Sequence, residues 1–252
     1  GSLLNDEVTI GNKKGKDWAD ETISQLKSMS NVIVKNRSQV FGYYDHNMLV
    51  MSERTKDHIE NPTIYTPRQK LWYIRAKEVI ISTGSIERPL VFGNNDRPGI
   101  MLASAAKEYI KVYGVLVGKK PIVFTNNDSA YDCAIEFKKN GINPLVLDVR
   151  NNSDSSVVKE AKNLNIDIRF SHGIANTKGY LRVNSVTIGK LNNDKSGYEN
   201  LENIPCDCIC VSGNWTPTVH LSSQSGNKLK FDEIISAFIP NQSHQNETAV
   251  GS

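Results

Sequence analysis

The amino-acid sequence predicts an α/β fold of two units, the second inserted in the first and each carrying a β-meander. Over residues 102–170, short apolar runs alternate with longer amphipathic runs, which is typical of a parallel sheet with crossover helices. Two apolar strands that end in Gly84 and Gly213 flank the larger part of the chain, which indicates an insertion. Three extended runs within residues 38–75 predict an antiparallel meander in the flanking unit.

The first unit begins with an expected helix at residues 17–29. Trp18, Ile23 and Leu26 recur at helical spacing and form one apolar stripe. The apolar triplet at 32–34 predicts a short strand after this helix.

A three-stranded meander is expected next. The extended runs 38–44 and 47–53 are joined at Asp45-His46-Asn47, which is a hairpin signal. A polar loop containing two prolines follows, and the extended pattern resumes at 70–75. These runs predict three antiparallel strands.

The strand at 78–83 is expected to be buried on both faces, because Glu-Val-Ile-Ile-Ser-Thr is almost continuously apolar. The segment 88–99 is rich in Pro and Gly and is interpreted as a linker. In the second unit we expect helix 102–113, strand 121–125, helix 130–140, strand 144–148, helix 155–163, strand 166–170 and extended runs at 181–191 and 207–211.

Composition and charge argue against several classes of protein. The 30 basic and 27 acidic side chains leave a net charge of +3, too balanced to indicate nucleic acid or an anionic membrane as a partner. The apolar stretches are far shorter than a membrane-spanning helix requires. The chain does not open with the charged and apolar regions of a signal peptide. We therefore expect a soluble, cytoplasmic protein.

Neither a metal site nor a catalytic group is expected. Cys206, Cys208 and Cys210 alternate at period two, which places three sulfur atoms on one face of a strand. The paired C-x-x-C spacing of zinc sites is missing. No histidine is spaced to pair with a second ligand, and neither a Ser-His-Asp order nor a pair of catalytic carboxylates stands out.

The turn after the strand at 121–125 lies where a Rossmann-like unit carries its dinucleotide fingerprint. Asp148 supplies the acidic residue expected about 20 residues further on. The fingerprint glycines are replaced by Asn126-Asn127-Asp128-Ser129-Ala130, which adds side chains where a pyrophosphate would lie. We interpret Asp128 as a cap of the following helix and the fingerprint as degenerate and non-binding.

Two strand ends indicate a cofactor edge in the first unit. Ile80-Ile-Ser-Thr-Gly-Ser85 and Cys210-Val-Ser-Gly-Asn-Trp-Thr-Pro217 are apolar strands that end in glycine. A glycine at the carboxyl end of a parallel strand lets the backbone approach a cofactor closely. Two such ends around an α/β insertion are more informative than either end alone.

The order of these motifs resembles that of flavoproteins with two FAD/NAD(P)-binding-type domains. Longer polar strings are similar to the alpha subunits of heterotetrameric sarcosine oxidases, and the similarity covers essentially the whole chain. The strings are Phe41-Gly-Tyr-Tyr-Asp-His-Asn47, Glu87-Arg-Pro-Leu-Val-Phe92, the run 94–106, Phe124-Thr-Asn-Asn-Asp-Ser-Ala-Tyr131 and the run 215–226.

The resemblance implies membership of an oxidoreductase complex that acts on CH–NH bonds with oxygen as acceptor. Such a complex demethylates sarcosine to glycine and yields hydrogen peroxide and 5,10-methylenetetrahydrofolate. It holds FAD and FMN mainly on a beta subunit and also contains gamma and delta subunits. Its alpha subunit binds NAD, so this chain would supply NAD binding and interfaces but no catalytic residue.

The resemblance also implies which residues bind the cofactor. Ser2 would contact NAD, Val40 would lie on the adenine side, and Thr83 and Gly84 would approach the cofactor at the sheet edge. A core position for Val40 and an interface role for Trp215 are the structural alternatives. The nicotinamide side would be closed by Gly213, Trp215, Thr216 and Pro217.

The predicted domains follow from the same resemblance. Residues 1–88 and 212–226 would form a first NAD domain that is incomplete, because its glycine-rich turn and ribose-binding acid would precede Gly1. Residues 89–211 would form the inserted Rossmann-like domain. Residues 227–252 would connect to a tetrahydrofolate-binding domain beyond the chain.

Two other functions stay open. One is the alpha subunit of a related opine or amine dehydrogenase, although that group tends to carry iron–sulfur cysteines near this region, which the C-x-C-x-C run does not supply. The other is a non-catalytic interaction module in which both dinucleotide sites are inactive.

Overall fold

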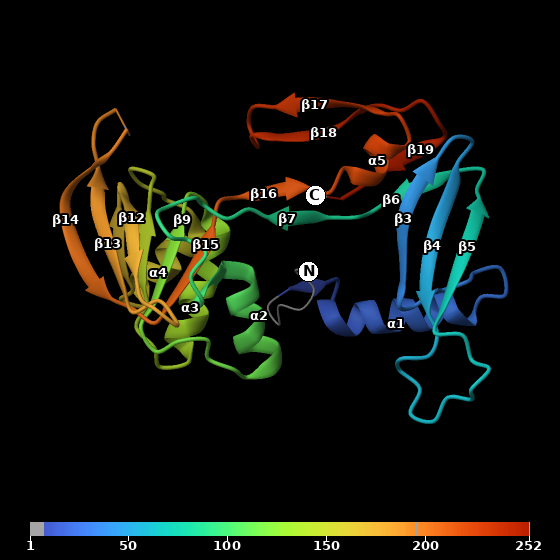
Figure 1. Cartoon of the computed structure of the whole chain (residues 1–252), viewed down its shortest axis with the longest axis horizontal. Coiled ribbons are helices and arrows are strands. Elements are labelled where there is room, and N and C mark those ends of the chain that lie inside the picture. Colours follow the sequence, from blue (N-terminus) through green and yellow to red (C-terminus); the bar gives the residue numbers. More distant parts are fainter. Residues whose placement is uncertain (1–7, 195, 252) are drawn as a thin grey trace. The chain divides into compact units, whose positions relative to one another are not determined.

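The chain divides into two compact units in this computed structural model, which describes residues 8–194 and 196–251. Unit 1 comprises Gly1–Gly84 and Pro217–Ser252, and unit 2 comprises Ser85–Thr216 (Figure 1). Unit 2 is therefore inserted in unit 1, as the paired glycine-ended strands predict. The chain crosses between the units twice.

Unit 2 is built on a five-stranded sheet in which every pair of neighbouring strands is parallel. The sheet confirms the α/β pattern read from the sequence. In spatial order its strands are β11 (Asp167–Phe170), β10 (Leu145–Asp148), β9 (Pro121–Thr125), β15 (Cys208–Ser212) and β8 (Ile100–Leu102).

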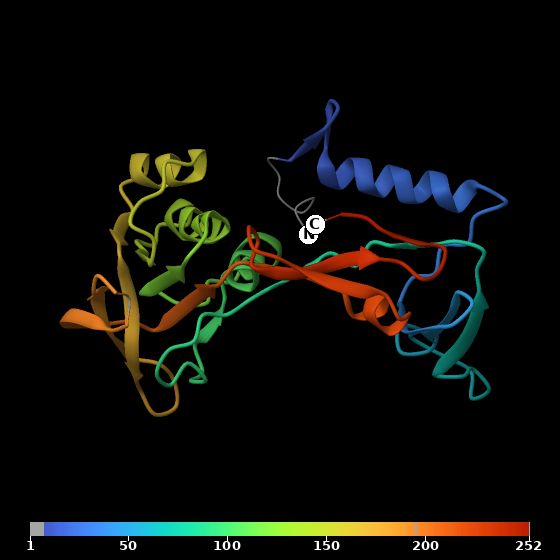
Figure 2. The ribbon, with the colours of Figure 1, turned by 90° about the horizontal axis from the view of Figure 1, so that it is seen from above.

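Helices cover one face of this sheet and an antiparallel meander covers the other (Figure 2). Successive residues of a strand point to opposite faces, so Val123 packs in the helical cluster while Ile122 and Phe124 pack against the meander. The helices are α2 (Ala103–Tyr113), α3 (Tyr131–Lys139) and α4 (Ser156–Asn163), and the meander strands are β12 (His172–Lys178), β13 (Ser185–Leu191) and β14 (Tyr198–Pro205).

The four cysteines are buried and not joined by disulfides. Cys208 and Cys210 pack with Cys133 on the helical face. The sulfur atoms of Cys208 and Cys210 lie 3.7 Å apart. Cys206 packs on the opposite face, in the meander cluster. The prediction of three sulfur atoms on one face is therefore wrong for Cys206, because this residue precedes β15 and lies outside its alternation.

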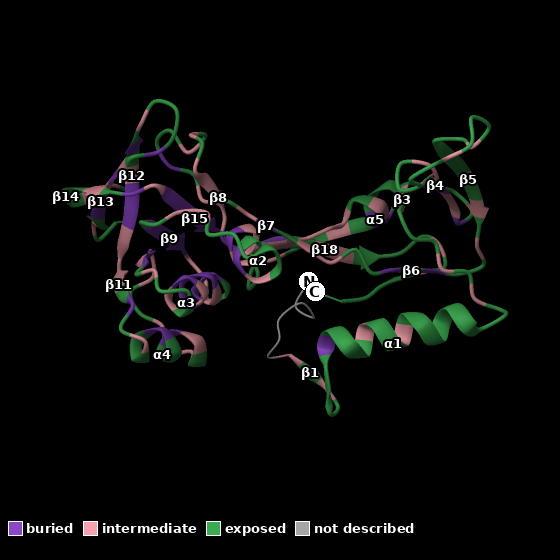
Figure 3. Cartoon of the chain, turned by 90° about the horizontal axis from the view of Figure 1, so that it is seen from below, coloured by how far each residue is buried: buried purple, intermediate pink, exposed green. Residues whose placement is uncertain are grey.

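Unit 1 contains the predicted three-stranded antiparallel meander. The triplet 32–34 forms no strand, and Ile33 is largely exposed. Helix α1 (Gly15–Ser28) forms as predicted but is exposed along most of its length (Figure 3). The meander strands are β3 (Ser38–Tyr44), β4 (Met48–Arg54) and β5 (Gln69–Arg75), and a short hairpin of β1 (Thr9–Ile10) and β2 (Lys13–Lys14) precedes α1.

Strand β6 (Val79–Ile81) pairs in parallel with β19 (Glu247–Ala249). Val79 and Ile81 are buried, whereas Ile80 is 73% exposed. The prediction of burial on both faces is wrong, because only the side of β6 that faces the Tyr43 cluster is covered by other described residues.

The remaining elements follow unit 2 in the sequence or lie at its ends. Residues 227–252, predicted to be a connector, contribute an antiparallel hairpin and the strand that pairs with β6. No helix in the described part of the chain is both long and apolar enough to cross a membrane. The elements are β7 (Ser85–Glu87), β16 (Trp215–Pro217), α5 (His220–Gln224), β17 (Lys228–Asp232) and β18 (Ala237–Gln242).

Candidate functional site

The carboxyl ends of β6 and β19 form one edge in unit 1. The amide of Val250 donates to the carbonyl of Ile81 at 2.9 Å, so the two segments stay hydrogen-bonded at the ends of the paired strands. Each segment then reaches a glycine with positive φ, +66° at Gly84 and +101° at Gly251. A Cβ at either glycine would meet nothing within 4 Å. The left-handed backbone, not crowding, therefore favours glycine here, and this edge is open.

A hollow of about 630 Å³ lies beside this edge and is lined mainly by β3, β6 and α5. Val40 and Thr83 both line it, although they are far apart in the sequence. The Thr83 hydroxyl donates to the carbonyl of Thr218 at 2.7 Å, and the amide of Thr218 donates to the carbonyl of Gly84 at 2.8 Å. The returning chain thus fixes the end of β6.

The Val40 strand is shaped by a β-bulge. The pairing of β3 with β4 shifts between Val40 and Gly42, which leaves Phe41 out of the regular ladder. The Gln224 side chain accepts a hydrogen bond from the amide of Tyr43 at 3.1 Å and donates to the carbonyl of Phe41 at 3.5 Å. Helix α5 therefore satisfies backbone groups that the bulge removes from the sheet.

A polar cluster attaches β19 to α5. The Glu247 carboxylate accepts hydrogen bonds from the hydroxyls of Ser222 and Ser225, at 2.9 and 2.7 Å, and from the side-chain amide nitrogen of Asn227. Burial, together with the nearby Glu247 charge, raises the pKa of Tyr43 to about 12. These hydrogen bonds attach β19 to α5 and so fix the β19 side of the open edge.

The other predicted cofactor residues have separate positions. Ser2 lies outside the described residues. Gly213, Trp215 and Thr216 belong to unit 2, and Pro217 begins the second segment of unit 1. The structure therefore brings Val40, Thr83 and Gly84 to one region of unit 1, and their cofactor role stays a prediction.

Gly213 and Trp215 have contacts that explain them within unit 2. A Cβ on Gly213 would lie 2.8 Å from the carbonyl oxygen of Pro89, so this position requires glycine where the linker passes. The indole N–H of Trp215 donates to the hydroxyl of Ser129 at 2.9 Å. Trp215 thus contacts the turn that replaces the dinucleotide fingerprint.

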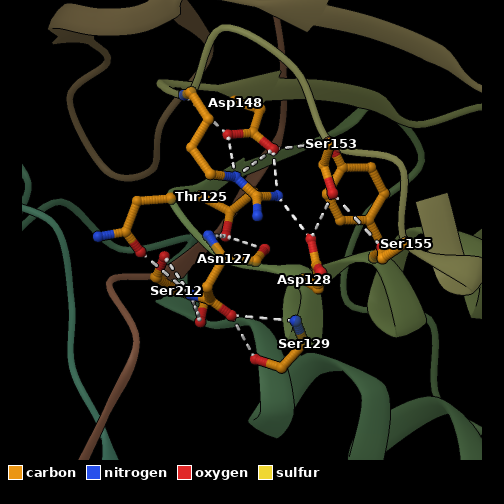
Figure 4. Close-up of polar contacts among 11 residues, drawn as sticks. Thr125, Asn127, Asp128, Ser129, Asp148, Ser153, Ser155 and Ser212 are labelled. Carbon is orange, nitrogen blue, oxygen red and sulfur yellow. Dashed lines mark hydrogen bonds and ion pairs between the residues drawn. The ribbon is translucent and has the colours of Figure 1, made fainter. Parts of the chain in front are cut away.

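That turn is fastened to the edge of the unit 2 sheet (Figure 4). The side-chain amide nitrogen of Asn127 donates to the hydroxyl of Ser212 at 3.0 Å, and the hydroxyl of Thr125 donates to the carbonyl of Asn127 at 2.9 Å. The Asn127 side-chain oxygen accepts from the amide of Ser129 at 3.0 Å. The helical cap is therefore Asn127, and the interpretation of Asp128 as the cap is wrong.

Asp128 instead forms an ion pair with Arg150 at 2.7 Å and accepts a hydrogen bond from Ser153 at 3.0 Å (Figure 4). The same guanidinium binds the fully buried Asp148 carboxylate, with its Nη2 at 2.7 Å from Oδ2 and its Nε at 3.0 Å from Oδ1. The hydroxyl of Tyr131 donates to Asp148 at 2.8 Å. Asp148 is thus committed to internal contacts, and the sequence position of a ribose-binding acid does not make it available.

The electrostatics of the cluster follow from these contacts. Burial by itself would raise the pKa of Asp128, but hydrogen bonds from Arg150 and Ser153 outweigh it and the pKa is lowered. Hydrogen bonding to Asp148 raises the pKa of the Arg150 guanidinium, which stays charged. Burial and the hydrogen bond to Asp148 raise the pKa of the Tyr131 phenol.

These positions test whether each edge fits a dinucleotide. In unit 2 the first helical amide is already capped and two carboxylates surround the available cation, so the residues present do not fit a pyrophosphate. In unit 1 the glycine ends are open and border a hollow, so the edge fits a close approach of a cofactor to the backbone. Among the described residues, no group of three or more His, Cys, Asp or Glu side chains could hold a metal ion.

Sequence reasoning missed Gly251, Gln224, Asn127 and Arg150. Gly251 had a signal, because Ala-Val-Gly repeats the pattern of an apolar strand ending in glycine. Asn127 and Arg150 had local signals, because Asn is a common helix cap and Arg150 lies two residues after Asp148. Gln224 had none, since its partners on β3 lie 181 and 183 residues away in the sequence.

Comparison with known proteins confirms the resemblance seen in the motifs. No protein-family profile matches the chain. The chain is 34% identical over 240 residues to the sarcosine oxidase subunit alpha of Rhizobium meliloti (strain 1021), which is 95% of this chain and 23% of that protein. It is 34% identical over 238 residues to the subunit alpha of Corynebacterium sp. (strain P-1), covering 93% and 24% respectively. The chain thus spans about a quarter of the length of these relatives.

Solved structures show the same fold. The thioredoxin reductase of T. acidophilum matches 100% of this chain and 78% of its own, with a TM-score of 0.66 and 16% identity. The L-proline dehydrogenase of P. horikoshii matches 99% of this chain and 42% of its own, with a TM-score of 0.63 and 20% identity. These likenesses place both units in the Rossmann-like class.

Proposed function

We propose that this chain belongs to the alpha subunit of a sarcosine oxidase complex and forms part of its NAD-binding region. The relatives that match nearly the whole chain are named as alpha subunits of that oxidase, which supports a subunit of a flavin oxidoreductase complex. The relatives are much longer than this chain. The complete reaction therefore requires parts that the described units do not supply.

In the proposed complex, sarcosine, tetrahydrofolate and oxygen give glycine, 5,10-methylenetetrahydrofolate and hydrogen peroxide. FAD and FMN would be held mainly by the beta subunit, and gamma and delta subunits would complete the assembly. A further domain of the alpha subunit would bind tetrahydrofolate. No residue of this chain is assigned to amine oxidation.

One observation carries the NAD assignment: two glycine-ended parallel strands in unit 1 open beside a hollow lined by Val40 and Thr83. The backbone of Val40 would contact the adenine, and Thr83 and Gly84 would lie against the rest of the dinucleotide. When bound, NAD supplies a ring able to exchange hydride. The residues of this chain only bind and orient it.

The test is NAD binding to the intact alpha subunit. Gly84→Asn keeps a residue type that tolerates positive φ but adds a side chain on the open edge. We expect NAD to bind at least about tenfold more weakly, a loss of about 1.4 kcal/mol. Gly197→Ala, in the open hairpin of unit 2, is the control and should bind NAD as the unchanged protein does. Equal NAD affinity in both variants, with unchanged thermal stability, would refute this assignment.

A second candidate is an amine dehydrogenase of related build, which the likeness to L-proline dehydrogenase favours. The two functions differ in electron acceptor. The assembled complex should produce hydrogen peroxide from sarcosine and oxygen in equal amounts to the amine consumed. Oxidation that proceeds only with an artificial acceptor and without peroxide would favour the dehydrogenase.

A further inference from the structure

Unit 2 retains the architecture of a nucleotide site at the carboxyl edge of its sheet. In parallel sheets of this kind, phosphates meet the first amides of a helix that follows a central strand, which is β9 in this sheet. The corresponding turn here runs from β9 through Asp128–Ala130 into α3. Trp215 and Ser212 border the turn from the returning chain.

The amide that would receive a phosphate is already used. Ser129 donates both its amide and its hydroxyl to the Asn127 side chain, at 3.0 and 2.6 Å. The other end of the Asn127 side chain donates to Ser212 on the neighbouring strand. The turn is therefore held down on the sheet edge, and Arg150 is the cationic group beside it.

The cation at this edge is shared by two carboxylates of unequal accessibility. Arg150 follows β10 and binds Asp148, whose side chain is fully buried, and Asp128, whose side chain is 39% exposed. Two negative charges against one positive charge repel an incoming phosphate. Asp148 is built into the core, whereas Asp128 lies in the turn that precedes α3 (Figure 4).

We infer that the Asp128 carboxylate replaces a nucleotide phosphate on Arg150, so that unit 2 is a nucleotide site closed by its own side chain. The proposed NAD edge lies in unit 1, and this inference does not depend on it. Unit 2 then keeps a hidden anion site whose cation is Arg150.

The test uses inorganic pyrophosphate and ADP, titrated into the full chain by calorimetry and by Trp215 fluorescence. The unchanged protein should show no saturable binding that depends on Arg150. Asp128→Asn and Asp128→Gly should each bind pyrophosphate at least about tenfold more tightly than the unchanged protein. Adding Arg150→Gln to either variant should abolish the gain.

Asp132→Asn is the matched control, because Asp132 lies in the first turn of α3 but pairs with Lys107 at 2.8 Å. It removes the same charge without touching Arg150 and should bind no more pyrophosphate than the unchanged chain. The inference fails if the folded Asp128 variants gain no affinity, or if Asp132→Asn gains as much. It also fails if the unchanged chain binds ADP in an Arg150-dependent way.

Discussion

Arg150 forms ion pairs with two carboxylates that differ in burial. Comparing the two pairs shows how burial changes the stabilisation that an ion pair provides. The Asp148 side chain is fully buried, and the Asp128 side chain is partly exposed. An exposed pair is weakened by solvent, whereas removing one partner of a buried pair leaves an uncompensated group in the interior.

Replacing the two carboxylates should therefore have unequal effects on stability. We expect Asp148→Asn to lower the free energy of unfolding by about 2 to 4 kcal/mol, because the Asn amide carries no negative charge and offers Arg150 and Tyr131 one acceptor oxygen where the carboxylate offers two. Asp128→Asn should cost less than about 1 kcal/mol, since solvent screens this pair. Urea denaturation of the two variants measures the difference. Equal losses would show that Asp148 is not the structural partner of Arg150.

The Asp128 contribution should also depend on pH. Its pKa is lowered in the folded protein from the ordinary value of 3.8, so its stabilisation is present above that value and is lost as the pH falls through the folded pKa. The difference in melting temperature between the unchanged protein and Asp128→Asn should thus be constant near neutral pH and vanish in acid. Thermal unfolding at pH 7 and at a series of pH values below 3.8 checks this. A difference that persists in acid would rule out the ionised Asp128 as its origin.

At the scale of elements, backbone crowding explains why the residue after β15 is Gly213. A Cβ there would lie 2.8 Å from the carbonyl oxygen of Pro89 and 3.1 Å from that of Arg88, and both are backbone atoms. The linker and the end of β15 therefore lie too close together for any residue with a side chain at position 213.

Gly213→Ala is expected to destabilise unit 2 by about 1 to 3 kcal/mol, because backbone atoms cannot move aside as a flexible side chain does. Gly197→Ala is the comparison, since the nearest atom to its Cβ would lie at an ordinary 3.5 Å. Its effect should stay within about 0.5 kcal/mol. Chemical denaturation of the two variants is the measurement, and equal stability would contradict the crowding argument.

Other element features combine a local signal with a distant contact. The turn of the β3–β4 hairpin was readable from Asp45-His46-Asn47, and His46 and Asn47 indeed have φ of 58° and 51°. These values are typical of a tight hairpin turn. The bulge at Phe41 was not readable, because Gln224 supports it from 183 residues away.

At the scale of the whole molecule, the two units have cores of very different size. The cluster of unit 1 comprises three buried residues, Tyr43, Val79 and Ile81. Unit 2 buries both faces of its five-stranded sheet. Burial of apolar surface is the main stabilising contribution, so unit 2 is expected to be the more stable part.

Unfolding should therefore occur in two steps, with unit 1 lost first. The three tryptophans separate the steps, because Trp18 and Trp72 belong to unit 1 and Trp215 to unit 2. Urea titration followed by fluorescence should show both transitions, and Trp215→Phe should remove the later one. A single transition that is the same by fluorescence and circular dichroism would contradict independent stability.

The sequence by itself determined the elements and their grouping. The periodicity of apolar residues predicted the meander, the strands and helices of unit 2 and the insertion, because periodicity is set by the geometry of each element. The sequence also contains strings that resemble those of sarcosine oxidase alpha subunits, and it indicated Thr83, Gly84 and Gly213 as special strand ends. Whether Val40 and Thr83 bind a cofactor stays a prediction.

Only the tertiary structure decided which side chains meet. It shows Asp128 as the ion-pair partner of Arg150 and not as a helix cap, and it places Cys206 on the opposite face of the sheet from Cys208 and Cys210. It also left Ile80 exposed. The physical reason is that these ion pairs and this burial depend on neighbours from other segments of the chain. The packing of the sheet determines those neighbours, and a local sequence pattern contains no information about it.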